Sequence, residues 1–375
     1  MKKVLFATTA LVASAGFAAA DVSLSGSAQM GVQGGHTISN PGGTSGGTAP
    51  VADNATFVSA ETQFVQDIDV TFTLSGETDG GLTFGAAIDL DESAGGVGTD
   101  DAGVAIFLSG DFGTLTMGDT DGAMDAAMQD PNVTAGSIND DETSHVGLVN
   151  SYLDGAYDGQ ILSYSYTVAG FTIIGSIEMD DTGARDNGYA IGARYTGDFG
   201  GGSYTIGAGY QVATPRDSWM LGNFNVVVFE DLAASEGTDA VEGFGYYVDE
   251  VTAMGISGSV ALDAGLTVTA AYTQYEAEGN ANVPVPGTSF DTTHMAIGAS
   301  YTFDAITVAA NYGHVEIDNL GEFSGYGLSA AYDLGGGLSA HVGYGSSDYS
   351  YNTNVLPNAF DDTISTWSLG VAMSF

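Results

Sequence analysis

The chain has 375 residues, with 47 Asp and Glu against 5 Lys and Arg, and a formal net charge of −42. This acidic balance excludes a nucleic-acid-binding protein, because such proteins present basic surfaces to phosphates. The sequence contains no Cys, which excludes disulfide frameworks, thiolate metal sites and cysteine nucleophiles. Charged residues are 14% and apolar residues 44% of the chain, which is too apolar for a disordered acidic tail.

The first twenty residues have the pattern of a secretory signal peptide. Lys2 and Lys3 form a positive start, residues 4–17 are mostly apolar, and residues 18–20 are three Ala that suit a cleavage site. The apolar stretch is short for the ~20 residues of a transmembrane helix. We therefore expect export with cleavage after Ala20, which leaves residues 21–375 as one mature domain.

Beyond residue 20, apolar and polar residues alternate along the chain. Leu82, Phe84, Ala86, Ile88 and Leu90, for example, are interleaved with Thr, Gly, Ala and Asp. Similar runs occupy residues 68–74, 189–195, 254–262, 266–272, 295–303 and 367–375. A period of two residues predicts strands with one apolar and one polar face.

The connections between these runs alternate between turn-sized and long. The short ones are rich in Gly and Asp and lie near residues 76–81, 110–113, 170, 197–202, 263–265, 304 and 334–337. The long, polar ones lie at roughly 33–60, 92–101, 119–159, 179–187, 214–251, 277–291, 317–323 and 347–363. Together they join sixteen strands. We therefore expect an all-β fold, a 16-stranded antiparallel transmembrane β-barrel with short periplasmic turns and long extracellular loops.

The composition of the polar face distinguishes this barrel from a soluble sandwich, whose strands also alternate. The residues between the apolar positions are mostly Gly, Ala, Ser and Thr, and no Lys follows residue 3. Small polar residues suit a water-filled lumen, while the apolar face contacts lipid. Aromatic residues next to the short turns suit an interfacial girdle: Phe84, Phe171, Tyr195, Tyr204, Tyr301, Phe303 and Tyr332.

With a signal peptide, an opening strand at residues 21–26 and a final alternating strand from Trp367 to Phe375, the chain resembles the trimeric general-diffusion porins of Gram-negative outer membranes. The resemblance covers essentially the whole mature chain. It implies a homotrimer in membrane lipid and lipopolysaccharide, and a third long loop that folds inward to narrow the pore. It also implies that Trp367 and Phe375 form the signal read by the barrel-assembly machinery.

The third loop, residues 119–159, is strongly acidic, and we expect it to form the pore constriction. Its candidate residues are Asp119, Asp121, Asp125, Asp130, Asp140, Asp141 and Glu142, and His145 is its one side chain that could become cationic. The resemblance implies a basic cluster on the facing wall, but strands one to five contain no Lys or Arg. The lumen-facing positions there carry Asp67, Asp69, Asp89 and Asp91, and the one basic residue in lumen-facing parity is Arg194.

Catalytic patterns are absent from the sequence. The five His show no metal-binding spacing, and no G-x-S-x-G nucleophile elbow occurs, so we expect no enzyme activity and no cofactor. Calcium is a weaker hypothesis. Asp119 with Asp121, and Asp140 with Asp141 and Glu142, offer the oxygen ligands that Ca²⁺ prefers, but without the twelve-residue loop of an EF-hand. Divalent ions could alternatively bridge loop carboxylates to lipopolysaccharide phosphates.

We therefore predict an outer-membrane pore that passes small hydrophilic solutes and ions and favours cations. One alternative is a substrate-specific channel, which would need a track of lumen-facing rings; Phe107 and Tyr275 are the two such rings identified. Another alternative is a non-conducting surface or adhesin barrel. Single-channel conductance distinguishes the three.

Overall fold

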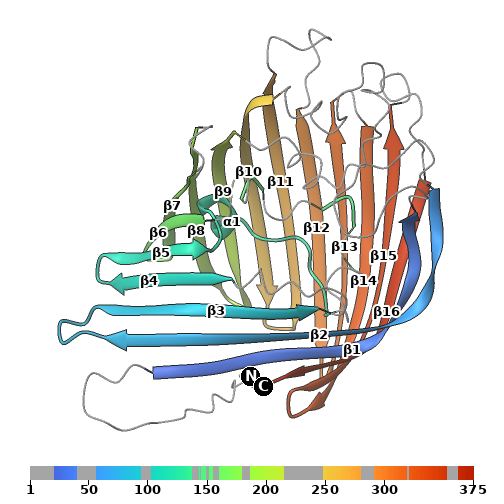
Figure 1. Ribbon diagram of the computed structural model, residues 1–375, viewed down its shortest axis with the longest axis horizontal. Helices are drawn as coiled ribbons and strands as arrows, with labels where there is room; N and C mark the ends of the chain where they lie inside the picture. The colour runs from blue at the N-terminus through green and yellow to red at the C-terminus, as the bar shows by residue number, and fades with distance from the viewer. Residues whose placement is uncertain are drawn as a thin grey trace.

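In the computed structural model the chain closes into one antiparallel β-barrel of sixteen strands (Figure 1). It describes residues 21–39, 56–93, 103–136, 143, 145–148, 152–154, 160–179, 186–214, 248–279, 291–318, 321–352 and 362–375. The expected signal peptide, residues 1–20, lies outside them. Within the described part of the chain, no helix is long and apolar enough to cross a membrane.

The strands follow one another around the barrel in chain order, and β1 pairs with β16. Their bounds are β1 (Asp21–Ser39), β2 (Thr56–Glu77), β3 (Thr83–Ser93), β4 (Val104–Gly110), β5 (Gly113–Asp119), β6 (Gln160–Val168), β7 (Phe171–Glu178), β8 (Gly188–Phe199), β9 (Gly202–Ala213), β10 (Val248–Leu262), β11 (Leu266–Gly279), β12 (Thr292–Phe303), β13 (Ile306–Ile317), β14 (Gly321–Gly335), β15 (Leu338–Tyr351) and β16 (Asp362–Ser374). One short helix, α1 (Ala123–Ala127), lies between β5 and β6. The predicted sixteen-stranded antiparallel barrel is confirmed.

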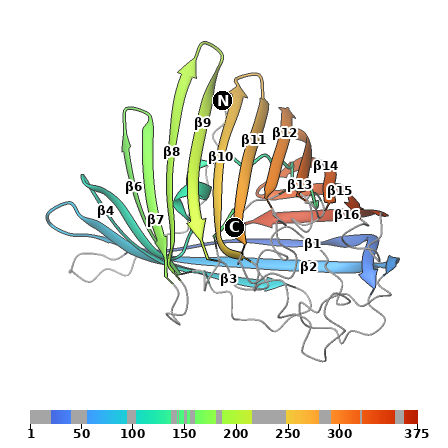
Figure 2. The ribbon, with the colours of Figure 1, turned by 90° about the horizontal axis from the view of Figure 1, so that it is seen from above.

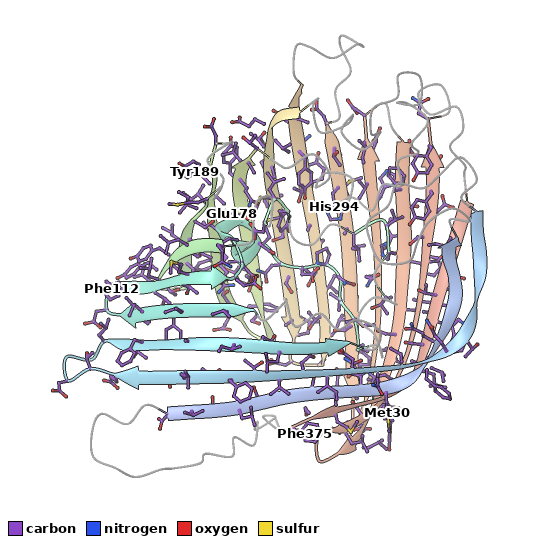
Figure 3. The ribbon with its side chains drawn as sticks, viewed as in Figure 1. Met30, Phe112, Glu178, Tyr189, His294 and Phe375 are labelled. Carbon is purple, nitrogen blue, oxygen red and sulfur yellow. The ribbon has the colours of Figure 1, made fainter. Side chains whose placement is uncertain are left out.

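The alternation in the sequence matches the two faces of the barrel wall. Apolar side chains at alternate positions are exposed on the outer surface, such as Ile256 on β10 and Ile297 on β12. The side chains between them point inward, and Figure 3 shows His294 and Glu178 inside the barrel, with Met30, Tyr189 and Phe375 on its outer surface. Every strand is paired on both sides, so the barrel has no free sheet edge.

Five of the seven aromatic residues predicted for the girdle contact one another beside the short turns. The ring centroids of Phe171 and Tyr195 are 4.5 Å apart, and those of Tyr195 and Tyr204 are 6.0 Å apart. Tyr301 stacks on Phe303 at 5.6 Å. Rings at this level of the outer surface are typical of the membrane interface of a barrel.

Five of the long connections are shorter than the sequence predicted. Those expected at 214–251, 277–291 and 347–363 are reduced to 214–247, 280–291 and 352–361, because β10, β11, β15 and β16 continue into them. The first long connection was expected at residues 33–60. In the structure β1 continues to Ser39 and β2 begins at Thr56, because residues 35–39 pair with residues 56–60. A β-bulge between Gln33 and Gly35 shifts the register of this pair. The connection expected at 317–323 is only residues 318–320, since Ile317 pairs directly with Gly321.

Candidate functional site

The third loop enters the barrel and lies against its inner wall (Figures 1 and 2). It leaves β5 after Asp119 and rejoins the wall at Gln160, as its predicted bounds required. Its helix α1 packs against β7, β8 and β9. Farther along, the backbone N–H of Val146 donates to Ser347 Oγ on β15 at 3.1 Å. The described part of the loop therefore follows the wall from β7 to β15, on the side of the barrel opposite β1–β5.

Serine side chains on the wall hold the loop by accepting hydrogen bonds from its backbone. Ser176 on β7 accepts from the N–H of Ala123 at 2.8 Å, and Ser257 on β10 accepts from that of Gln129 at 2.7 Å. Ser329 on β14 accepts from the N–H of Ala135 at 2.7 Å. These bonds satisfy loop amides that would otherwise be buried without a partner.

The two ends of the loop meet at one carboxylate, that of Asp154. Its Oδ2 accepts from the N–H of Gly122 at 2.7 Å, and its Oδ1 accepts from Gln211 Nε2 at 2.6 Å. Gln211, on β9, also accepts from the N–H of Leu153 at 3.1 Å. Burial raises the pKa of Asp154 to about 6, although both hydrogen bonds favour the charged form. This carboxylate therefore joins the start of the loop, its end and the wall.

Asn311 on β13 is the central wall contact of the second half of the loop. Its Nδ2 donates to Asn132 Oδ1 at 2.8 Å, and its Oδ1 accepts from His145 Nε2 at 3.0 Å. His145 Nδ1 accepts from the N–H of Gly147, so the ring is neutral with its proton on Nε2. Burial lowers the pKa of His145 to about 4. The one loop side chain that could become cationic is therefore uncharged at neutral pH.

An apolar core lies between the loop and the wall, which the sequence analysis did not anticipate. Met124, Met128 and Leu153 of the loop pack in one cluster with Val251 and Phe323, which point inward from β10 and β14. Tyr275, expected as a pore-lining ring, is buried in the same cluster and only 2% exposed. The signal that could have revealed this core is the presence of large apolar residues in lumen-facing parity on β10–β15.

The loop acids fall into two groups. Asp121 and Asp130 on the loop are exposed, and so is Asp119, which is the last residue of β5. Asp125 on α1 is half-buried, and burial together with the charge of Asp154 raises its pKa to about 8, so it is largely neutral at pH 7. Asp140, Asp141 and Glu142 lie outside the described residues.

The wall formed by β1–β5, opposite the loop, is also acidic. Asp69 on β2 accepts a hydrogen bond from Ser27 Oγ at 2.8 Å, and Asp89 on β3 accepts from Thr71 Oγ1 at 2.9 Å. Asp67 is half-buried on the same face of β2. Asp91 on β3, also predicted to face the lumen, pairs with Asp69 on β2, but its side chain is not among those that the structure describes.

Asp89 and Asp119 lie on either side of Gly103, both close to the position of a Cβ atom there. The side chains of Asp89 on β3 and Asp119 at the end of β5 therefore lie near each other. Among the described residues, however, no three His, Cys, Asp or Glu side chains are grouped closely enough to hold a metal ion.

Arg194 is the only Lys or Arg in the described ranges, and it contacts the loop. From the inner face of β8, its Nη1 donates to the backbone carbonyl of Ala126 in α1 at 3.1 Å. The guanidinium is exposed. The one fixed positive charge of the described lumen therefore binds a carbonyl group of the loop, on the same side as α1.

The predicted assembly residues lie at the seam where the barrel closes. β1 and β16 pair from Ser27 with Ser374 to Gly35 with Thr366, and the N–H of Phe375 donates to the carbonyl of Gly26 at 2.9 Å. The pairing of β1 with β16 thus begins at Gly26, five residues after Asp21, the first residue of β1. Trp367 covers Gly34 directly across the seam, and Phe375 is 73% exposed.

Comparisons with known proteins agree with this architecture. A family model described as Gram-negative porin matches residues 7–352. A porin of Rhodobacter capsulatus is 31% identical over 317 residues, which cover 82% of this chain and 91% of that protein. A porin structure refined at 1.8 Å shares the fold with a TM-score of 0.60 and 24% identity, over 94% of this chain and all of that one. An engineered variant of the Rh. blastica porin has a TM-score of 0.54 at 18% identity. The chain belongs to the Gram-negative porins, outer-membrane channels rather than enzymes.

Proposed function

We propose that the protein is a passive pore for small hydrophilic solutes and ions that selects cations over anions. The observation that supports this proposal is the distribution of charge in the lumen. Exposed acids occur at Asp121 on the loop, at Asp119 where β5 ends, and at Asp89 on the facing wall, where Asp69 is half-buried, while Arg194 binds a backbone carbonyl of the loop. Solutes would pass between two acidic surfaces.

Acidic lumen surfaces favour cations because they raise the local cation concentration in a narrow, low-dielectric passage. The range of this effect depends on salt: the Debye length is about 10 Å at 0.1 M and about 3 Å at 1 M. Selectivity is therefore expected to be strong in dilute salt and weak in molar salt.

Reversal potentials across a KCl gradient in planar bilayers test the proposal. The Asp69→Asn/Asp89→Asn and Asp121→Asn variants should each lose cation preference, and Arg194→Ala should gain some. Glu316→Gln is the matched control, because it removes one charge from the outward face of β13. Anion selectivity of the unmodified protein, or equal losses in the control, would refute the proposal.

The substrate-specific alternative is not favoured by the rings that motivated it. Tyr275 is buried beneath the loop, which leaves Phe107 as the one candidate from the pair. A saturable block of conductance by a sugar would nevertheless identify a specific channel, and the absence of any conductance would identify a non-conducting surface barrel.

We infer further that the protein is exported with cleavage after Ala20, is folded by the barrel-assembly machinery and associates as a homotrimer. The resemblance to general-diffusion porins supports these three inferences. The acidic composition supports a fourth, that divalent cations such as Ca²⁺ bridge loop carboxylates to one another or to lipopolysaccharide. N-terminal sequencing measures the cleavage site, native mass spectrometry measures the trimer, and thermal dissociation with and without a chelator measures the effect of divalent cations.

A further inference from the structure

The wall beneath the loop is built from small residues that lie side by side on successive strands. One row of directly paired, inward-facing residues crosses β9 to β15: Gly207, Ser257, Ala271, Ala296, Gly313, Gly325 and Ser347. A second, parallel row crosses β11 to β14 with Thr269, Gly298, Asn311 and Gly327. Large side chains are missing from both rows.

Loop backbone atoms occupy the space that side chains would fill at five of the wall glycines. A Cβ atom at Gly192, Gly207, Gly298, Gly313 or Gly327 would lie less than 3.0 Å from a carbonyl oxygen of the loop. The oxygens belong, in the same order, to Ala123, Ala127, Pro131, Gly147 and Thr143. Because each obstacle is backbone, the loop has to move if a Cβ atom is added, since no side-chain rotation can relieve the contact.

These five glycines, which we call the seat glycines, are not required by their backbone conformation. None of them has a positive φ angle, so an L-residue could adopt the same local geometry. Glycine inside a strand weakens the strand and commonly marks a site where another backbone approaches closely. The close approach of the loop is thus the physical reason for glycine at these positions.

We propose that the seat glycines are positioning residues that set how far the loop projects into the lumen, and hence the cross-section of the pore. The loop lies on the lumen side of the wall, so any group added at the seat displaces it toward the pore axis. Two of the acids proposed to select cations, Asp69 and Asp89, lie on β2 and β3, far from the seat in the strand order, whereas Asp121 lies on the loop itself. Pore size and the contribution of the wall acids to charge selectivity therefore depend on different residues. This inference rests on the proposed pore function.

The test compares alanine substitutions at three kinds of glycine in the full-length protein. Gly298→Ala and Gly313→Ala add a methyl group against loop backbone. Gly255→Ala, also beneath the loop, meets only the flexible ends of Met124 and Met128 and the hydroxyl of Thr273, at 2.7 to 3.0 Å. Gly175→Ala, on the outward face of β7, has no other atom within 4 Å and is the matched control.

Single-channel conductance, and swelling rates of proteoliposomes in sugars of increasing size, report the cross-section of the pore. Gly298→Ala and Gly313→Ala should lose conductance and slow the larger sugars most, Gly255→Ala should lose less, and Gly175→Ala should match the unmodified protein. The reversal potential in a KCl gradient should keep its sign in all four. A conductance loss at Gly175 equal to that at the seat, or unchanged conductance at both seat positions, would overturn the inference.

The folded yield, scored by heat-modifiable migration in gels, keeps the test decisive if a seat variant assembles poorly. The inference then requires the loss of yield to follow the same order, greatest at Gly298 and Gly313 and absent at Gly175. Equal losses at all positions would contradict it. The outcome is separate from the proposed selectivity: an anion-selective pore with seat-dependent conductance would refute the proposed cation preference alone.

Discussion

Replacing Asn311 by Ala should loosen the second half of the loop while leaving the barrel intact. Asn311 is 4% exposed and makes two hydrogen bonds of 3.0 Å or less to loop side chains, those of Asn132 and His145. A third bond, from the N–H of Gly327, joins two strands of the wall. The substitution removes these three and two longer bonds, from Asn311 Nδ2 to the carbonyls of Val133 at 3.4 Å and Thr143 at 3.3 Å. It alters no apolar contact of the main core cluster.

The expected size of the effect follows from the two shorter bonds to the loop. Each of the two bonds to loop side chains contributes about 1 kcal/mol net. Their loss makes the seated position of the loop less stable by about 2 kcal/mol. Because about 1.4 kcal/mol corresponds to a factor of ten, the unseated fraction should rise about 30-fold. His145 would remain buried with Nε2–H unpaired, which adds to the loss.

Hydrogen exchange measures this loosening directly. The amides of Ala135 and Val146 are protected by wall serines, so their exchange should accelerate about 30-fold in Asn311→Ala if local opening limits it. Asn132→Ala is the control, because it removes only one of the two bonds and should accelerate exchange about 5-fold. Unchanged exchange in Asn311→Ala would show that the hydrogen bonds of Asn311 do not hold the loop.

Three further predictions concern pH and assembly. The pKa of Asp125 is raised from 3.8 to about 8, mainly by burial. The protonated carboxyl therefore contributes stability that is lost as pH rises between those values. Asp125→Asn should flatten the decline in unfolding midpoint between pH 5 and pH 8. His145 acts in the opposite direction, because its pKa is lowered to about 4 and stability is lost as pH falls below about 6.5; His145→Gln should remove that acid-side loss. Deleting Phe375 removes the bond to Gly26 at the seam and should reduce the folded yield more than the conductance of the channels that form, whereas normal yield would contradict the assembly role.

The barrel could be predicted from sequence because its determinants are local. A strand such as β12 shows its two faces through alternation alone, with Met295 and Ile297 outward and His294 and Ala296 inward. The start and end of the third loop were also correct, since β5 ends at Asp119 and β6 begins at Gln160. Where the expected bounds failed, as at β1 and β2, the cause was pairing between residues whose own sequence lacks clear alternation.

The contacts inside the barrel could not be predicted in this way, because they join residues far apart in the chain. Asn311 and Asn132 are separated by 179 residues, and neither has a local pattern that identifies its partner. Gly207 and Gly209, or Gly325 and Gly327, are visible in the sequence as alternating small residues. Their function depends on which loop backbone lies above them, and that follows only from the closed barrel.

Burial also changes the charges that a sequence count assigns to the loop. Counting formal charges gives Asp125 a full negative charge and His145 a possible positive one, yet burial makes both mostly neutral at pH 7. Among the described acids, Asp121 is exposed on the loop and Asp89 on the wall, while Arg194 is bound to the carbonyl of Ala126. On the proposed function, the field in the pore then has one sign on both sides. Such a field attracts solutes by their net charge and exerts little orienting force across the pore, because Arg194 is the one Lys or Arg side chain of the described wall and is bound to the loop.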